Sequence, residues 1–253
     1  MADFDINQIA STLDSEDMIG FTRSFVEDIR KGLNAVNIDR YPWIEEISSG
    51  QWQGVLALGM GGSAAGGDFL SSICDLKGSI PVVVQRDYVI PAWWDDQWLV
   101  IATSHSGNTE EAIEATEIAL KSGATVIVIS TGGILSGLAE LHYNCYLIPS
   151  IGGQPPRSAF SHIFARQLAL FRCLGIIPSD NDDQAMLTRL QAVVEEYDFI
   201  NSDEGTAAKL DLARAYINMN DIDQAVKTLE EVGRCGDDHQ KGQAKDLLNK
   251  ITR

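Results

Sequence analysis

The polarity pattern of the chain alternates between short apolar runs and segments with helical spacing. Five runs rich in Val, Ile and Leu have the length and composition of buried strands. They lie at about residues 54–58, 80–84, 98–103, 125–130 and 145–148. Helix-period segments separate them at about residues 64–76, 109–122 and 135–141. This alternation predicts an α/β fold with a doubly wound, parallel, five-stranded, flavodoxin-like sheet and helices on both faces.

The segments outside the sheet are expected to be helical. An amphipathic stretch at about residues 14–36 predicts a helix before the sheet, and another helix is expected at about 158–174. The polar residues 179–183 indicate a linker, and a connecting helix is expected at about 184–197. Residues 206–251 show helical periodicity only, which predicts a small C-terminal all-helical unit. The predicted domain boundaries are 1–178, 179–205 and 206–253.

Charge limits the partners that the protein can bind. The net charge is −17, and residues 203–253 hold 10 acids and 8 bases, which leaves 26 acids and 11 bases for the preceding part. Such a surface repels nucleic acid and anionic lipid, so a phosphate ligand has to be held by backbone N–H groups and hydroxyls. There is no run of 18 apolar residues, and the chain begins with acidic residues. We therefore expect no membrane insertion and a cytoplasmic protein.

A glycine-rich turn follows the first predicted strand and opens a helix. Gly61 and Gly62 lack a Cβ, so the backbone there can approach an anion at the helix N-terminus. Gly59, Gly61 and Ala64 also match the G-x-G-x-x-A fingerprint of dinucleotide-binding folds, so a nicotinamide or flavin protein stays open as an alternative. A tight turn that serves only packing is the other alternative.

The third predicted strand ends in a second loop with several hydroxyls. Ser104, Ser106 and Thr109 cluster where the strand meets the next helix, and Gly107 permits a tight turn. This combination predicts a phosphate cradle. Asn108 or Thr109 could instead simply cap the helix, with Glu111 in its first turn, but that alternative leaves the other hydroxyls unexplained.

Three motifs together resemble those of the bifunctional phosphoglucose/phosphomannose isomerases, which belong to the sugar isomerase (SIS) superfamily. They are GMGGS at 59–63, SHSGNTE at 104–110 and PRSAF at 156–160. The resemblance covers roughly residues 10–178. It implies a SIS domain that binds a sugar phosphate such as fructose 6-phosphate, without metal or organic cofactor. It also implies a homodimer. The four cysteines lack CxxC spacing, so the sequence suggests neither a disulfide framework nor a zinc site.

The resemblance assigns roles to individual residues. It implies that the hydroxyls of Ser63, Ser104, Ser106 and Thr109 hold the phosphate. Arg157 would lie beside the reacting carbons, and an arginine there can stabilise the negative charge of an enediolate intermediate. A helix-start arginine that pairs with a surface acid is the structural alternative.

The resemblance does not supply every catalytic group. In the family the glutamate base lies in a second SIS domain and a histidine comes across a dimer interface, whereas the residues after Pro178 do not resemble that second domain. His105 stands where the family has an aromatic residue, and Ser161 stands where its motif continues with glycine. We take His105 as a candidate for acid/base chemistry, with a single structural hydrogen bond as the alternative.

The C-terminal segment has a resemblance of its own. Residues 212–217, 220–225 and 229–232 are similar to a tetratricopeptide repeat, in which small residues let two helices approach closely. The segment also looks like the short C-terminal domain of the bacterial hub protein that organises type IV pilus assembly at the cell pole. Docking of a protein partner is one expectation, and a helical cap over apolar surface is the other.

Three functions follow in order of preference. The first is an aldose–ketose isomerase that interconverts glucose 6-phosphate or mannose 6-phosphate with fructose 6-phosphate, or a truncated relative of such an enzyme. The second is a non-catalytic phosphosugar sensor or scaffold that uses the helical tail to bind a partner. The third is a dinucleotide-binding enzyme that uses the glycine-rich turn.

Overall fold

The computed structural model describes residues 14–48, 50–179, 183–200, 203–219 and 221–251. These residues form two compact units. One unit is Gly20–Asp183, and the other includes the helices that follow Asp183.

The first unit is built on one sheet whose strands all run parallel. The strands are β1 (Val55–Leu58), β2 (Val82–Gln85), β3 (Leu99–Ser104), β4 (Val126–Ser130) and β5 (Cys145–Pro149). Their spatial order is β2-β1-β3-β4-β5. Every residue of β1, β3 and β4 is buried, as expected for a parallel sheet that is covered on both faces. The predicted doubly wound, flavodoxin-like α/β fold is confirmed.

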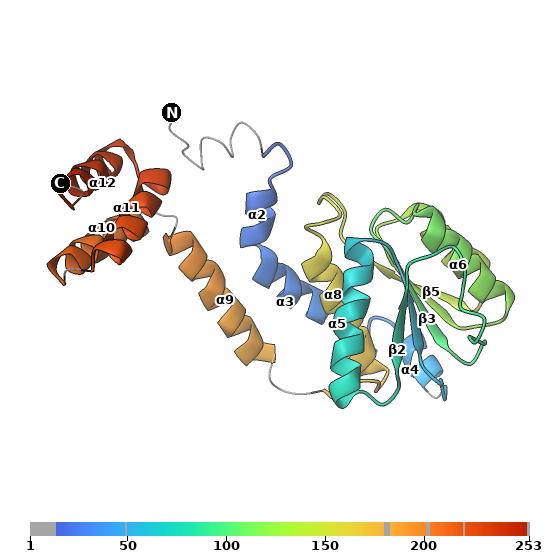
Figure 1. The fold of residues 1–253 in the computed structure, drawn as a ribbon. Coiled ribbons are helices and arrows are strands. Elements are labelled where there is room, and N and C mark those ends of the chain that lie inside the picture. The colour runs from blue at the N-terminus through green and yellow to red at the C-terminus, as the bar shows by residue number, and fades with distance from the viewer. Residues whose placement is uncertain (1–13, 49, 180–182, 201–202, 220, 252–253) are drawn as a thin grey trace. The chain divides into compact units, whose positions relative to one another are not determined.

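Helices cover both faces of this sheet (Figure 1). The helices up to residue 173 are α2 (Met18–Arg23), α3 (Phe25–Ala35), α4 (Trp43–Ser48), α5 (Gly62–Lys77), α6 (Glu110–Lys121), α7 (Gly133–Leu141) and α8 (Phe160–Cys173). Of these, α5 and α8 pack on one face of the sheet and α6 and α7 on the other, whereas α3 packs on α8. Successive strand residues point to opposite faces. Val55 and Ala57 therefore join the core with α5 and α8, whereas Leu56 and Leu58 join the core with α6 and α7.

The helix expected at about residues 14–36 is divided in the structure. It forms α2 and α3, which are separated at Ser24. The hydroxyl of Ser24 lies 3.2 Å from the carbonyl oxygen of Phe21 and 3.0 Å from Oδ2 of Asp28. Serine side chains that bond to nearby backbone compete with a regular helix, which explains the interruption. The short helix α4 was not predicted.

The C-terminal unit is all-helical, as predicted. Its helices are α9 (Asp183–Ile200), α10 (Asp203–Asn218), α11 (Ile222–Cys235) and α12 (Asp238–Ile251), shown in Figure 1. Leu210, Ala213, Leu229, Val232 and Ala244 are its buried apolar core. Because Ala213 is small and completely buried, α10 and α11 can pack closely.

Side-chain caps mark where two of these helices begin. Asp221 caps α11 by accepting a hydrogen bond from the Gln224 amide. Asp237 and Gln240 form a reciprocal capping box before α12, with distances of 2.7 and 3.1 Å. Among the residues that the structure describes, none of the helices is both long and apolar enough to cross a lipid bilayer.

Candidate functional site

The candidate site lies where the strand order of the sheet reverses. β1 pairs with β2 on one side and with β3 on the other, so the loops after β1 and β3 leave the same edge in neighbouring positions. Ligands of such sheets bind in the crevice at this edge. The loop after β1 opens α5 and the loop after β3 opens α6, and neither helix has a side-chain cap at its N-cap residue. Uncapped N-termini present N–H groups and a partial positive charge to an anion.

The loop after β3 is held in shape by its own hydroxyls. Ser104 is 1% exposed, its Oγ lies 2.8 Å from Oγ1 of Thr109, and it accepts a hydrogen bond from the Gly107 amide at 3.1 Å. Ser106 is exposed, and its Oγ accepts a hydrogen bond from the Asn108 amide at 3.2 Å. Thr109 is the N-cap residue of α6, but its hydroxyl meets Ser104 and does not cap the helix.

Ser63 connects the loop after β1 to the loop after β3. Its Oγ accepts a hydrogen bond from the backbone amide of His105 at 3.3 Å. On the other side of that loop, the hydroxyl of Thr131 donates to the His105 carbonyl oxygen at 2.7 Å. The structure thus brings Ser63 to the loop that carries Ser104 and Ser106.

The loop between β5 and α8 approaches the same place through its backbone. A Cβ built on Gly62 would lie 3.6 Å from the carbonyl oxygen of Pro156 and 3.9 Å from the Cα of Arg157. The side chain of Arg157 is exposed. Three loops, which follow β1, β3 and β5, therefore meet at the carboxyl end of the sheet.

His105 makes a structural contact in this arrangement. Its Nε2 lies 2.9 Å from the carbonyl oxygen of Gln154, which can only accept, so Nε2 carries the hydrogen. Its Nδ1 is buried and has no hydrogen-bond partner among the described residues. The geometry therefore matches the structural alternative for His105, because its Nε2 is hydrogen-bonded to a backbone carbonyl.

Polar residues behind the loops were missed as site residues by the sequence analysis. Asp28 is 6% exposed and accepts a hydrogen bond from the side-chain amide of Gln154 at 3.3 Å. The ring of His162 is completely buried, and its centroid lies 6.4 Å from that of His105. Burial lowers the pKa of His162 to about 4, and the neighbouring Arg166 guanidinium acts in the same direction. No local sequence motif identifies these residues as part of a site, because they lie in α3, in α8 and in the loop before α8.

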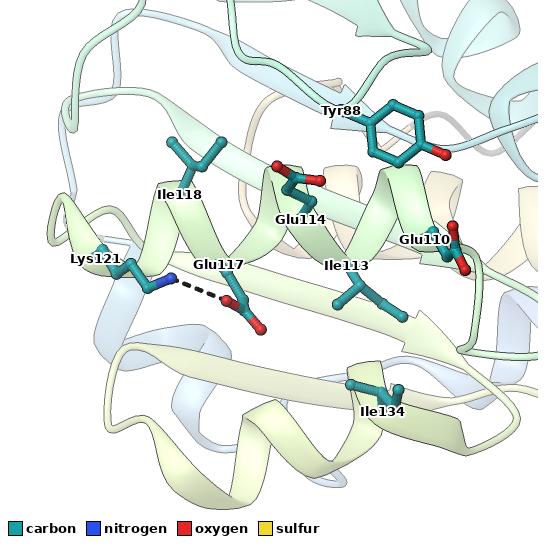
Figure 2. A pocket seen from close by; sticks show the side chains of 8 residues that line it. All are labelled: Tyr88, Glu110, Ile113, Glu114, Glu117, Ile118, Lys121 and Ile134. Atoms are coloured by element: carbon teal, nitrogen blue, oxygen red, sulfur yellow. Dashed lines mark hydrogen bonds and ion pairs between the residues drawn. The ribbon is translucent and has the colours of Figure 1, made fainter.

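A groove on the outer side of α6 is a separate feature (Figure 2). It has a volume of about 540 Å³ and is lined by Tyr88, Glu110, Ile113, Glu114, Glu117, Ile118, Lys121 and Ile134. Three glutamates and one lysine are among these residues, so the groove is negatively charged. Carboxylates of α6, chiefly that of Glu111, raise the pKa of Tyr88. Lys121 is paired with Glu117 at 2.9 Å. Negatively charged side chains of this kind repel a phosphate.

A metal site is not apparent in the described part of the chain. There, no three His, Cys, Asp or Glu side chains gather in a way that could hold a metal ion.

Comparison with solved structures identifies the class of fold. The structure is similar to that of tagatose-6-phosphate ketose/aldose isomerase from Escherichia coli, with a TM-score of 0.50 and 20% sequence identity. The similarity covers 68% of this chain and 53% of that chain. The doubly wound fold is thus one that a phosphosugar isomerase also has.

Sequence relatives give a more specific similarity. A bifunctional phosphoglucose/phosphomannose isomerase of Caldicellulosiruptor bescii is 43% identical over 145 residues, which are 56% of this chain and 42% of that protein. The predicted resemblance to these isomerases is confirmed. This chain spans less than half the length of that relative.

The C-terminal unit matches a different group of proteins. The family model described as Tetratricopeptide repeat matches residues 183–251. The motility hub protein FimV of Pseudomonas aeruginosa is 38% identical over 71 residues, which are 28% of this chain and 8% of that protein. The two similarities that the tail sequence suggested are therefore both found.

Proposed function

We propose that the loops after β1, β3 and β5 bind the phosphate of a sugar phosphate, and that the chain acts in aldose–ketose isomerisation. The substrates would be fructose 6-phosphate and glucose 6-phosphate or mannose 6-phosphate. The observation that carries the proposal is the hydrogen bond from the His105 amide to Ser63 Oγ, which joins the two phosphate-binding loops. The sequence similarity to phosphoglucose/phosphomannose isomerases supports the same reaction.

The proposal gives each loop a task. The phosphate would be held by the backbone and hydroxyls of Gly61, Gly62, Ser63, Ser104, Ser106 and Thr109. Arg157 would stabilise the charge that develops on the enediolate while a proton moves between C1 and C2. His105 stays in the site as a residue that holds the loops, since its Nε2 is bonded to the backbone.

Turnover of fructose 6-phosphate by the full chain tests this proposal. We expect formation of glucose 6-phosphate and mannose 6-phosphate, measured with coupled dehydrogenases. Arg157→Ala should lower kcat about 10²-fold to 10³-fold with a small change in KM, because electrostatic stabilisation acts mainly on the transition state. Arg189→Ala removes an exposed arginine of α9 and should leave kcat unchanged.

Thermal-shift measurements separate the other functions from this one. Binding of fructose 6-phosphate without turnover by the unmodified protein would support the sensor or scaffold instead. Stabilisation by NAD or NADP, with none by sugar phosphates, would contradict the proposal and favour the dinucleotide enzyme.

We also propose that the first unit pairs with a second copy of itself. Phe69 of α5 is 55% exposed, and its ring lies 5.4 Å from that of Phe160 and 5.6 Å from that of Phe164, both of α8. Exposed aromatic patches of this kind often mark protein interfaces. Sedimentation equilibrium should show a dimer that Phe69→Asp dissociates. Leu141→Asp, at an exposed site of α7, should stay dimeric, and equal effects of the two variants would contradict this interface.

For the C-terminal unit we propose a protein partner. It has its own apolar core, and Leu212 and Met219 expose 47% and 75% of their surface. The match to the tetratricopeptide repeat model supports partner binding.

A cytoplasmic location is part of the proposal, because Cys74, Cys145 and Cys173 are free thiols, which persist in reducing compartments.

A further inference from the structure

Gln154 links the loop after β5 to two other parts of the first unit. Its backbone carbonyl accepts a hydrogen bond from His105 Nε2 at 2.9 Å. Its side-chain amide donates to Oδ2 of Asp28 in α3 at 3.3 Å. The residue therefore connects this loop to the loop after β3 and to α3.

Asp28 makes the link difficult to break. Its side chain is 6% exposed, and Oδ2 also lies 3.0 Å from the hydroxyl of Ser24. A buried carboxylate is costly unless hydrogen-bond donors reach it. If Gln154 moved away, Asp28 would lose one of these donors, so the carboxylate resists any displacement of Gln154.

The chain on the other side of Arg157 is fixed as well. The amides of Ser158 and Ala159 both donate to the carbonyl oxygen of Pro155, at 3.0 and 3.2 Å. The hydroxyl of Ser158 donates to the same oxygen at 2.9 Å. Arg157 thus lies within a hydrogen-bonded turn that begins directly after Gln154.

We propose that Gln154 and Asp28 are positioning residues that hold the turn with Arg157 against the phosphate-binding loops. The inference rests on the proposed function for the role of Arg157. Neither residue needs to touch the sugar phosphate, because the pair acts through the backbone between Gln154 and Arg157.

A charge substitution tests the pair directly. Gln154→Glu places a carboxylate where the amide donated, so the introduced carboxylate and Asp28 should repel each other above the pKa of the new group. At pH 8 we expect hydrogen exchange of the Ser158 and Ala159 amides to quicken about tenfold, the factor expected when a hydrogen bond to a charged group is lost. At pH 5, where the introduced carboxyl can bind a proton and donate again, exchange relative to the unmodified protein should recover.

A double variant that swaps the carboxylate and the amide between positions 28 and 154 provides the rescue. Asp28→Asn combined with Gln154→Glu restores one donor and one acceptor, and should return amide protection at pH 8 to within about threefold of the unmodified protein. Gln53→Glu is the matched control. Gln53 is exposed, and its side-chain amide donates a hydrogen bond to the side chain of Gln97. This substitution should not change exchange at Ser158 or Ala159.

Ligand binding connects the pair to Arg157. 5-Phosphoarabinonate carries a carboxylate in place of the enediolate, and its affinity should fall about tenfold in Gln154→Glu at pH 8. The affinity for inorganic phosphate should stay within about twofold, because the phosphate-binding loops are intact. A uniform loss of both affinities would contradict the positioning role.

Unchanged exchange in Gln154→Glu, or no rescue by the double variant, would overturn the inference. Hydrogen exchange needs no ligand. If the unmodified protein binds neither phosphate compound, the proposed function fails, while the exchange rates still decide whether Gln154 and Asp28 hold the turn.

Discussion

Replacement of Gly107 by alanine is expected to destabilise the first unit more than any other glycine substitution in its loops. Gly107 has φ +70°, and a Cβ there would lie 1.8 Å from the carbonyl oxygen of Gly132 and 2.6 Å from Oγ of Ser130. The left-handed conformation costs a non-glycine residue about 1–2 kcal/mol. The contact with backbone adds to this cost because the loop after β4 cannot move aside freely.

The segment after β4 is tied by hydrogen bonds to the loop that carries Gly107. The Leu135 amide donates to the Gly107 carbonyl oxygen at 3.0 Å, and the Thr131 amide donates to the His105 carbonyl oxygen at 3.1 Å. Relief of the clash therefore breaks part of the hydrogen-bond network that shapes the loop after β3. We expect Gly107→Ala to lower the free energy of unfolding by about 4 kcal/mol, in the range of the most damaging single substitutions.

Gly175→Ala is the matched control for Gly107→Ala. Gly175 has the same φ of +70°, but no atom outside Gly175 and its two chain neighbours lies within 4 Å of the Cβ position. Its substitution should cost only the conformational part, about 1–2 kcal/mol. Urea denaturation followed by circular dichroism measures both variants. Equal losses of stability would show that the contact with Gly132 is not the cause. Sugar-phosphate binding should be lost in Gly107→Ala and kept in Gly175→Ala.

The fold was predictable because the buried strands of the sheet correspond to a strong local pattern of apolar residues in the sequence. A strand that is buried on both faces reads as a continuous apolar run, and Val126–Ser130 and Leu99–Ser104 have this form. The helix before the sheet was less predictable. Its apolar spacing continues through Ser24, and only the side-chain contacts of that serine show why it divides.

The candidate site was predictable only in part. Ser63, Ser104 and Thr109 stand beside strand ends, so the topology of the sheet brings their loops together. Asp28 and Gln154 are 126 positions apart and share no motif, so their hydrogen bond could not be inferred from spacing. A structural hydrogen bond is one of the two expectations for His105. Its acceptor could not be predicted, because it is a backbone carbonyl, which every residue has.

Acid is expected to destabilise the first unit through His162. The side chain is completely buried, and burial lowers its pKa to about 4, with contributions in the same direction from Arg166 and His105 and an opposing one from Asp28. In an unfolded chain the pKa of histidine is about 6.5. Between these two values the unfolded state binds a proton that the folded state does not. The free energy of unfolding therefore falls as the pH decreases from about 6.5 to about 4, and the contribution is fully present above pH 6.5.

The magnitude follows from the difference between the two pKa values. A difference of about 2.5 units corresponds to roughly 3 kcal/mol, which is a large part of the stability of a typical domain. The unfolding free energy of His162→Gln should therefore depend less steeply on pH between about 6.5 and about 4.5 than that of the unmodified protein. At neutral pH this variant should have a lower unfolding free energy, because the substitution alters the contact of His162 Nδ1 with the Ser150 hydroxyl at 3.2 Å. His142→Gln, at the C-cap of α7, is the control for loss of an imidazole elsewhere in the first unit. Denaturation by urea at a series of pH values measures all three slopes. If His162→Gln kept the slope of the unmodified protein, the acid sensitivity would come from the carboxylates of the unit, and the buried imidazole would have no part in it.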